Sequence, residues 1–196
     1  MNADPPSRPR GRPRRFDERA ALDAAERLFG ARGYAEVGVA ELCRALGLRP
    51  PSLYAAWGSK LGLFEATLER YAEGVGARFA AAIEGAADRD ALWRALLGDA
   101  ARLYTGGERR GCLALESTGS GDADVRDLAA RHAEGTRRML AARLAALGVE
   151  DAETEARALL VALRGVSAEA RAGASTRTLL RAVEALVAGR SAAPDA

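Results

Sequence analysis

Two adjacent prolines, Pro50 and Pro51, constrain the fold of this 196-residue chain more tightly than any other feature. A proline disfavours the α conformation in the residue before it, so Arg49 and Pro50 should be extended and Pro51 should take the first position of a helix. Gly47, just upstream, favours a tight turn after the preceding helix. The segment therefore predicts a short helix, ending near Trp57, that follows another helix across a turn.

Apolar residues recur at intervals of three and four on both sides of this segment, which indicates amphipathic helices. We expect a first helix from about Phe16 to Gly33, a second with Gly38 at its N-cap position, and a long fourth helix capped by Ser59. Aromatic residues make up only 5% of the chain and β-branched runs are scarce, so we predict an all-α fold class. Further helical patterns cover residues 90–104, 122–147, 151–172 and 176–189, with a short segment from Cys112.

Charge is unevenly distributed along the chain. Residues 1–60 hold eleven Lys or Arg against seven Asp or Glu, a net of +4, so the remaining residues carry 18 minus 20, or −2. Residues 1–15 contain four prolines and five arginines and almost nothing to bury, which predicts a disordered basic arm. The asymmetry indicates that the N-terminal part contacts a polyanion, with ordinary surface charge as the alternative.

The sequence indicates a cytoplasmic protein with reduced cysteines. No apolar run approaches the roughly 20 residues of a membrane span, and no hydrophobic segment follows the N-terminal arginines as it would in a signal peptide. Cys43 and Cys112 are therefore expected to be free thiols, with Cys43 in the core of the second helix.

Two short helices joined by a glycine-containing turn are typical of a helix-turn-helix, whose second helix enters the major groove of DNA. On this interpretation residues 51–57 form the recognition helix, and Ser52 and Tyr54 offer hydroxyls to phosphates or base edges. The helix N-terminus is expected to present free backbone N–H groups to a phosphate. Lys60, the only lysine, falls in the first turn of the next helix, where a cation is disfavoured unless a phosphate is near; a solvated surface charge is the alternative.

Residues 16–71 resemble the DNA-binding domain of the TetR/AcrR (tetracycline-repressor) family of bacterial transcriptional regulators. The resemblance implies that Tyr54 and Lys60 grip phosphates. It also implies that Ala55 and Ala56 face the groove, where they offer only apolar contact. Gly38 lacks the hydroxyl that caps the second helix in many relatives. The DNA-binding set implied in this domain is Arg49, Pro50, Pro51, Ser52, Tyr54, Ala55, Ala56 and Lys60. The matching motifs are "AALDAAERLFGARGYAEV", "VAELCRALGL", "PPSLYAAWGSK" and "LGLFEATLERY".

The arginine arm suggests a second DNA contact. Arg10-Gly11-Arg12-Pro13 resembles the core of an AT-hook, whose extended strand lies in a narrow minor groove. A generic basic tail that adds only counterion-release affinity is equally compatible with the residues. We assign Arg10, Arg12 and Arg14 to this predicted contact.

The resemblance implies that residues 61–190 form an effector-binding and dimerisation domain, followed by a tail at 191–196. The last two helical patterns have long apolar faces rich in small residues, which suit packing across a two-fold axis, and a homodimer would match a palindromic operator. At least half of the apolar candidates for an effector pocket are expected to be plain core. The candidate pocket residues are Trp93, Leu96, Tyr104, Cys112, Leu113, Leu115, His132 and Met139.

Cys112 is a candidate sensor of reactive species. Arg109 and Arg110 precede it, and nearby cations and a helix N-terminus favour the reactive thiolate form of a cysteine. Some members of the resembled family sense reactive species with a similar Arg-Gly-Cys-Leu segment, whereas others use the cysteine only for packing. Packing is the simpler interpretation here.

The predicted function is that of a ligand-responsive transcriptional regulator, a repressor released from double-stranded DNA by a small-molecule or electrophile effector. His132 is the only histidine, so a catalytic triad or a multi-histidine metal site is excluded, and we expect no catalytic residue, metal or cofactor. One alternative is a helical small-molecule-binding or thiol-dependent enzyme without sequence-specific DNA binding. Another is an architectural protein that binds DNA through residues 1–15.

Overall fold

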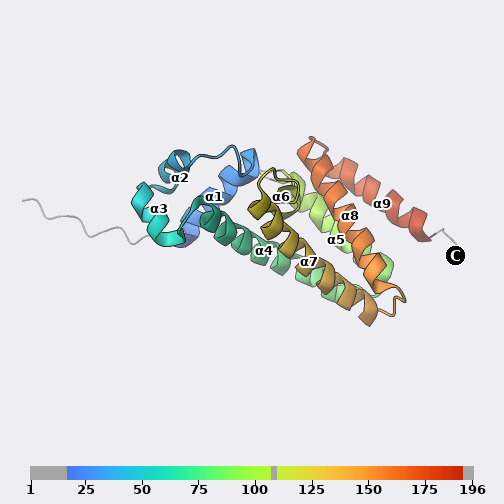
Figure 1. The fold of residues 1–196 in the computed structure, drawn as a ribbon. Helices are drawn as coiled ribbons and strands as arrows, with labels where there is room; N and C mark the ends of the chain where they lie inside the picture. Colours follow the sequence, from blue (N-terminus) through green and yellow to red (C-terminus); the bar gives the residue numbers. More distant parts are fainter. Residues whose placement is uncertain (1–16, 107–109, 192–196) are drawn as a thin grey trace, which may run out of the picture.

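The computed structural model describes residues 17–106 and 110–191, and in this part of the chain it contains helices and no strands. The predicted all-α fold class is confirmed. The basic arm with Arg10, Arg12 and Arg14, and also Arg109 and residues 192–196, lie outside the described residues. The helices, labelled in Figure 1, are α1 Glu18–Arg32, α2 Val39–Leu46, α3 Pro50–Trp57, α4 Lys60–Gly85, α5 Arg89–Thr105, α6 Leu113–Ser117, α7 Ala123–Ala146, α8 Ala152–Arg171 and α9 Thr176–Ser191.

Helices α1, α2 and α3 form a small head against the N-terminal half of α4 (Figure 1). The rings of Phe29 and Phe64 meet edge to face with centroids 5.2 Å apart, and both side chains are fully buried. Leu42 from α2 and Leu53 from α3 are also fully buried. Because each helix contributes at least one buried anchor, the orientation of α3 is fixed by the packing of the whole head.

Helix α3 begins one residue earlier than the double proline led us to expect. Pro50 is helical and Arg49 is the N-cap, with an extended backbone at φ −95° and ψ 153°. The expectation that Pro50 would be extended was therefore wrong. The first positions of a helix need no amide hydrogen, and the φ of proline already suits a helix, so both rings fit into the first turn despite the usual preference of a residue before proline.

Helix α4 is long enough, at about 39 Å for 26 residues, to belong to both halves of the molecule. Its N-terminal half packs on α1 and α3, and its remaining length packs on α5, α6 and α7. An ion pair of 2.6 Å between Arg70 and Asp23 ties it to α1. At its other end Arg143 of α7 donates hydrogen bonds to the carbonyls of Ile83 and Ala86, at 2.8 and 2.7 Å, which satisfies helix-terminal acceptors.

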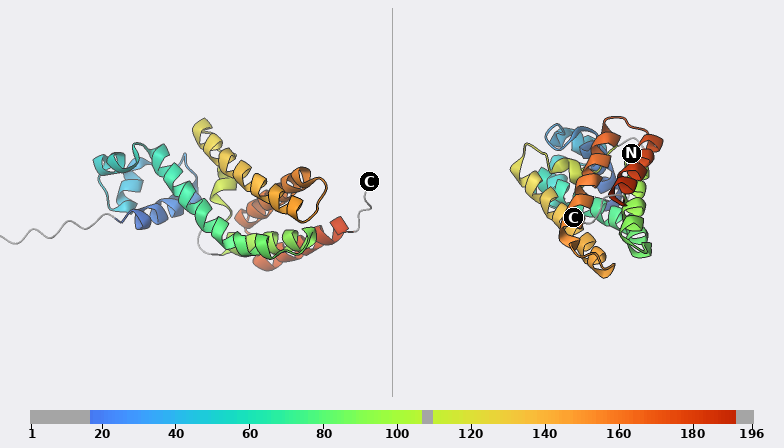
Figure 2. Two further views of the ribbon diagram at one scale, coloured as in Figure 1. Left: turned by 90° about the horizontal axis from the view of Figure 1, so that it is seen from below. Right: turned by 90° about the vertical axis from the view of Figure 1, so that its right-hand side faces the viewer.

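Helices α5, α7, α8 and α9 form the larger body, in which α5 packs on α8 and α9 while α7 packs on α8 and α4 (Figure 2). The short helix α6 lies between α7, α8, α4 and α1, so it contacts both the body and the head. No helix of the described residues is long and apolar enough to cross a membrane.

A glycine in the first turn of α4 lies directly against the end of α3. Ser59 caps α4 by accepting a hydrogen bond of 2.9 Å from the amide of Gly62, as the sequence predicted. A Cβ atom at Gly62 would overlap the carbonyl oxygen of Trp57, the last residue of α3. Gly62 therefore sets how closely the end of α3 approaches α4.

We predict that Gly62→Ala pushes α3 away from α4 and lowers the free energy of unfolding by about 1–3 kcal/mol, the usual cost of overpacking. Gly74→Ala, also inside α4 but with open space around its Cβ, is the matched control and should raise stability by about 0.5–1 kcal/mol. Urea denaturation of both variants checks this. Equal stability changes in the two variants would contradict the role of Gly62.

Candidate nucleic-acid interface and ligand cavity

The predicted DNA-contacting residues of α3 share one solvent-exposed surface. Leu53 is the only residue of this helix that is fully buried, and Tyr54 is 47% exposed. The ring of Trp57 is half-buried at the end of the helix. A helix that is anchored by one side and open on the other can enter a major groove. The exposed residues are Arg49, Pro50, Pro51, Ser52, Tyr54, Ala55 and Ala56.

The N-terminus of α3 differs from the expected phosphate site. Pro50 and Pro51 have no amide hydrogen, and the next two amides, of Ser52 and Leu53, both donate to the carbonyl of Arg49 at 2.9 and 3.2 Å. The expectation that this end presents free backbone N–H groups was therefore wrong. Phosphate contact by α3 must come from side chains, of which Arg49, Ser52 and Tyr54 have polar groups on the exposed surface.

Lys60 lies on an aromatic shelf rather than free in solvent. Its ammonium is 4.0 Å from the ring centroid of Tyr34, a cation–π distance. The Tyr34 ring in turn contacts the rings of Phe29 and Phe64, with centroid distances of 5.9 and 5.2 Å. The half-buried Lys60 is therefore held in place at the first residue of α4, close to the end of α3.

The pKa values of Lys60 and Tyr34 are both shifted by burial and by nearby carboxylates. Burial lowers the pKa of Lys60, and the negative charge of Asp122 partly opposes the change. The pKa of the Tyr34 phenol is raised, mainly by burial and additionally by Asp122 and Asp124. These two carboxylates belong to the start of α7, so the head and the body are electrostatically coupled at this point.

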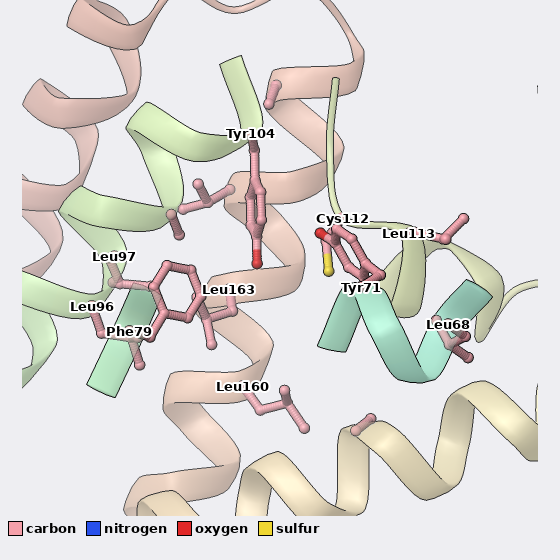
Figure 3. Packing of buried hydrophobic residues seen from close by; sticks show 14 of the residues in the cluster. Leu68, Tyr71, Phe79, Leu96, Leu97, Tyr104, Cys112, Leu113, Leu160 and Leu163 are labelled. Carbon is pink, nitrogen blue, oxygen red and sulfur yellow. The ribbon is translucent and has the colours of Figure 1, made fainter. Parts of the chain in front are cut away.

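A cavity of about 420 Å³ opens in the body between α4, α5, α6, α7 and α8. Its wall is mainly apolar, with polar groups from Thr136, His132 and Arg131 on α7. Figure 3 shows Tyr71, Phe79, Leu96, Tyr104, Cys112, Leu160 and Leu163, all of which line the cavity. Such a volume and lining are typical of small-molecule sites. The predicted pocket residues that line it are Leu96, Tyr104, Cys112, Leu115, His132 and Met139.

Two predicted pocket residues lie elsewhere. Trp93 is buried near the start of α5, and the guanidinium carbon of Arg190 on α9 lies 3.9 Å from its ring centroid. Leu113 is buried beside a smaller cleft and does not line the cavity. Neither residue lines this cavity, because helical spacing shows which residues point inward, but not whether they meet a neighbour or a void. Their assignment to an effector pocket stays a prediction.

The position of Cys112 is determined by a chain of hydrogen bonds. Gly111 makes a left-handed turn at φ 83°, and the amide of Cys112 then donates to Ser167 Oγ at 2.8 Å. The Ser167 hydroxyl donates in turn to Glu116 Oε1 at 2.6 Å. A Cβ at Gly111 would lie only 3.1 Å from Ser167 Oγ, so the turn is packed tightly against α8. Cys112 is buried and free, and lines the cavity; Cys43 is also free and is buried in the head.

Several residues of these sites were missed by the sequence analysis. Tyr34 had no signal, because its partner Lys60 is 26 positions away and the contact depends on the tertiary fold. Tyr71, Val75 and Phe79 recur at helical spacing along the fourth helix, but this spacing alone did not place them in the cavity that they line. A distinction between core and cavity requires the opposite wall, here supplied by α7.

A three-helix head with an exposed α3, joined through α4 to a helical body with a ligand-sized cavity, defines a class of DNA-binding regulator. The family model for bacterial regulatory proteins of the tetR family matches residues 21–67. The HTH-type transcriptional repressor BdcR of Escherichia coli (strain K12) is 36% identical over 177 residues, which are 88% of each chain. The chain therefore belongs to the TetR family, and it is a ligand-responsive, DNA-binding transcriptional regulator.

Two further relatives agree with this assignment. The HTH-type transcriptional repressor ComR of Escherichia coli (strain K12) is 49% identical over 72 residues, which are 37% of this chain and 32% of that protein. A cysteine-substituted variant of the TetR family transcriptional regulator CifR, solved in complex with a 26-base-pair double-strand operator DNA, is 31% identical. It superposes with a TM-score of 0.83 over 91% of this chain and 98% of CifR. The similarity thus extends through both head and body.

We predict that Lys60→Ala and Tyr54→Phe weaken DNA binding by similar factors on all sequences, because phosphate contacts carry no sequence information. Lys60→Ala should also reduce the slope of log K against log salt by about 1. Fluorescence anisotropy over a range of salt concentrations measures both quantities.

The controls for this prediction lie on α7 and α3. Arg138→Ala, at an α7 side chain that is 70% exposed, should leave affinity and slope unchanged. Ser52→Ala should alter preference at one base pair instead of lowering affinity uniformly. A Lys60→Ala protein with wild-type affinity and salt slope would show that Tyr34 holds this lysine for a reason other than DNA binding.

Proposed function

We propose that the protein is a repressor that binds a palindromic operator as a homodimer and leaves it when a small molecule occupies the 420 Å³ cavity. The proposal rests on one observation: α4 belongs both to the DNA-binding head and to the cavity wall. Its first residues support α3, and Tyr71, Val75 and Phe79 of the same helix form a wall of the cavity. The operator-bound structure of CifR and the repressor names of BdcR and ComR support it.

This proposal divides the chain into functional parts. Residues 16–60 are the DNA-binding domain and residues 61–190 are the effector-binding and dimerisation domain, with α4 as their link. The protein acts by binding rather than by turnover, and it works in the cytoplasm, where the DNA is. We retain the small-molecule-binding or thiol-dependent enzyme as the competing function, because Cys112 lies in a cavity.

The surface formed by α8 and α9 supports dimerisation. Val161 on α8 is 62% exposed and Leu186 on α9 is 45% exposed, which is unusual for large apolar side chains in a well-packed body. Both line one shallow surface depression together with Ala158 and Ala162. Small residues between larger apolar ones allow two helix pairs to approach closely around a two-fold axis.

The cavity lining indicates the kind of effector. Apolar and aromatic side chains dominate, while His132, Arg131 and Thr136 supply polar groups from α7, and Tyr71 and Tyr104 each carry a hydroxyl. A mainly apolar molecule with a few polar groups is therefore the expected occupant. Its effect on DNA binding is limited by the difference between its affinities for the DNA-bound and free conformations.

Val161→Glu should convert the dimer to a monomer, because the two-fold contact would bury two carboxylates without partners. Light scattering coupled to size-exclusion chromatography measures the mass. Ala77→Glu, at an exposed position of α4, is the control and should leave the mass unchanged. A dimer that persists in both Val161→Glu and Leu186→Glu would place the interface on another surface.

We also predict that N-ethylmaleimide reduces operator affinity at least tenfold if Cys112 senses electrophiles, since the adduct would fill the cavity. The thiolate adds to the maleimide double bond without a leaving group. Cys112→Ser should resist the treatment, whereas Cys43→Ser, at the cysteine buried in the head, should respond like the wild type. Equal affinity before and after complete modification of Cys112 would leave this residue a packing role only.

The proposed function is tested by selecting bound sequences from a random DNA library with the full chain. The expected result is a palindrome whose half-sites are about one helical turn apart, or a multiple of it. Enrichment of A·T-rich DNA without a palindrome would favour the architectural alternative. A library without any enriched sequence would remove the regulator and leave the enzyme.

A further inference from the structure

A second, smaller cleft of about 220 Å³ lies where the head meets the body. The head contributes the end of α1 and the following turn, residues 29–35, and the body contributes residues of α6 and of the 117–121 turn. Arg110 and Arg171 of the body also line it. A ligand bound in this cleft would contact the head and the body at the same time.

The side chains that line this cleft carry a net positive charge, and Asp122 and Asp124 lie near enough to raise the pKa of Tyr34 in its wall. Three arginines line it, Arg32, Arg110 and Arg171, against one carboxylate, Glu116. One oxygen of Glu116 already accepts the hydroxyl of Ser167, and Arg32 forms an ion pair of 2.6 Å with Glu41. The positive charge that remains uncompensated therefore comes from Arg110 and Arg171.

These two guanidinium groups bind only neutral acceptors among the described residues. Arg110 Nη2 donates to the carbonyl of Ala174 at 2.7 Å, and Arg171 Nη1 donates to the carbonyl of Gly30 at 3.2 Å. The Nε atom of Arg110 is buried and has no hydrogen-bond partner in this part of the chain. A buried donor without an acceptor is costly, so the Arg110 side chain has hydrogen-bonding capacity that the described residues do not use.

We propose that the cleft is a binding site for a small oxyanion, a compound with a carboxylate or phosphate group held by Arg110 and Arg171. The planar guanidinium fork matches the geometry of both groups, and charge-assisted hydrogen bonds are the strongest available to it. Ser117 and Ser120 also line the cleft and provide hydroxyl donors. The volume is sufficient for phosphate or a short dicarboxylate and is separate from most of the wall of the larger cavity.

The placement of the site gives the anion a consequence for the fold. Arg171 of α8 already bridges to the last turn of α1 through the Gly30 carbonyl. An anion held in the same cleft adds contacts across the junction, so it binds most tightly to the arrangement in which head and body are this close. The anion can bind in the absence of DNA. The proposed site therefore does not depend on whether the protein is a repressor.

The test is calorimetric titration of the full chain with inorganic phosphate and, separately, with succinate, in chloride buffers of constant ionic strength. The expected result is one saturable site per chain for at least one of the two anions. Arg171→Gln and Arg110→Gln should weaken it by about tenfold or more, as expected for loss of a charge-assisted bond. Arg138→Gln, at an exposed arginine of α7, should bind like the wild type.

The two cleft variants differ in how much structure they risk. Arg110→Gln removes the bond to Ala174 and could disturb the turn before α6, so its circular dichroism and melting temperature are compared with the wild type. Arg171→Gln changes an exposed side chain and decides the outcome. The proposal is overturned if neither anion shows saturable binding, or if folded Arg171→Gln binds as tightly as Arg138→Gln.

Discussion

The structure depends on one helix whose two ends pack against different helices within one continuous hydrophobic core. At its start α4 buries Leu63 and Phe64 against the head, and toward its end it buries Phe79 and Ile83 in the body. A close-packed interior resists small changes in side-chain position, so α4 cannot move at one end without disturbing its partners there. Any change in the body that rotates or shifts α4 must therefore also change the position of α3, which packs on it.

Other contacts connect head and body beside α4. The short helix α6 packs on α1, and Cys112 at its N-cap is tied through Ser167 to α8. Lys60 and Tyr34 lie close enough to Asp122 for its charge to affect the pKa of both. The start of α7 therefore lies near the head. The cavity is bordered by α6 and α7, so its occupant would act on the same elements that contact the head.

Much of this architecture followed from local sequence signals. Ser59 as the cap of α4, Gly38 as an N-cap without a side-chain bond and the left-handed Gly47 are properties of single residues and their neighbours. The start of α3 was predicted one residue too late, at Pro51 instead of Pro50. A residue before proline usually avoids the helical conformation, but the first turn of a helix accepts prolines, and here the second effect decides. The contact of Trp93 with Arg190, the contact of Tyr34 with Lys60 and the arginine cleft were not predicted, because each depends on segments distant in sequence.

We propose that two copies of α3, each supported by its own α4, read successive major grooves. The decisive measurement is a structure of the full chain bound to the DNA that it selects from a random library. We expect one α3 in the major groove of each half-site, with Ala55 and Ala56 toward the bases and the two helices about 34–36 Å apart or a multiple of that distance. A complex in which α3 faces solvent, or in which only residues 1–15 contact the DNA, would contradict it.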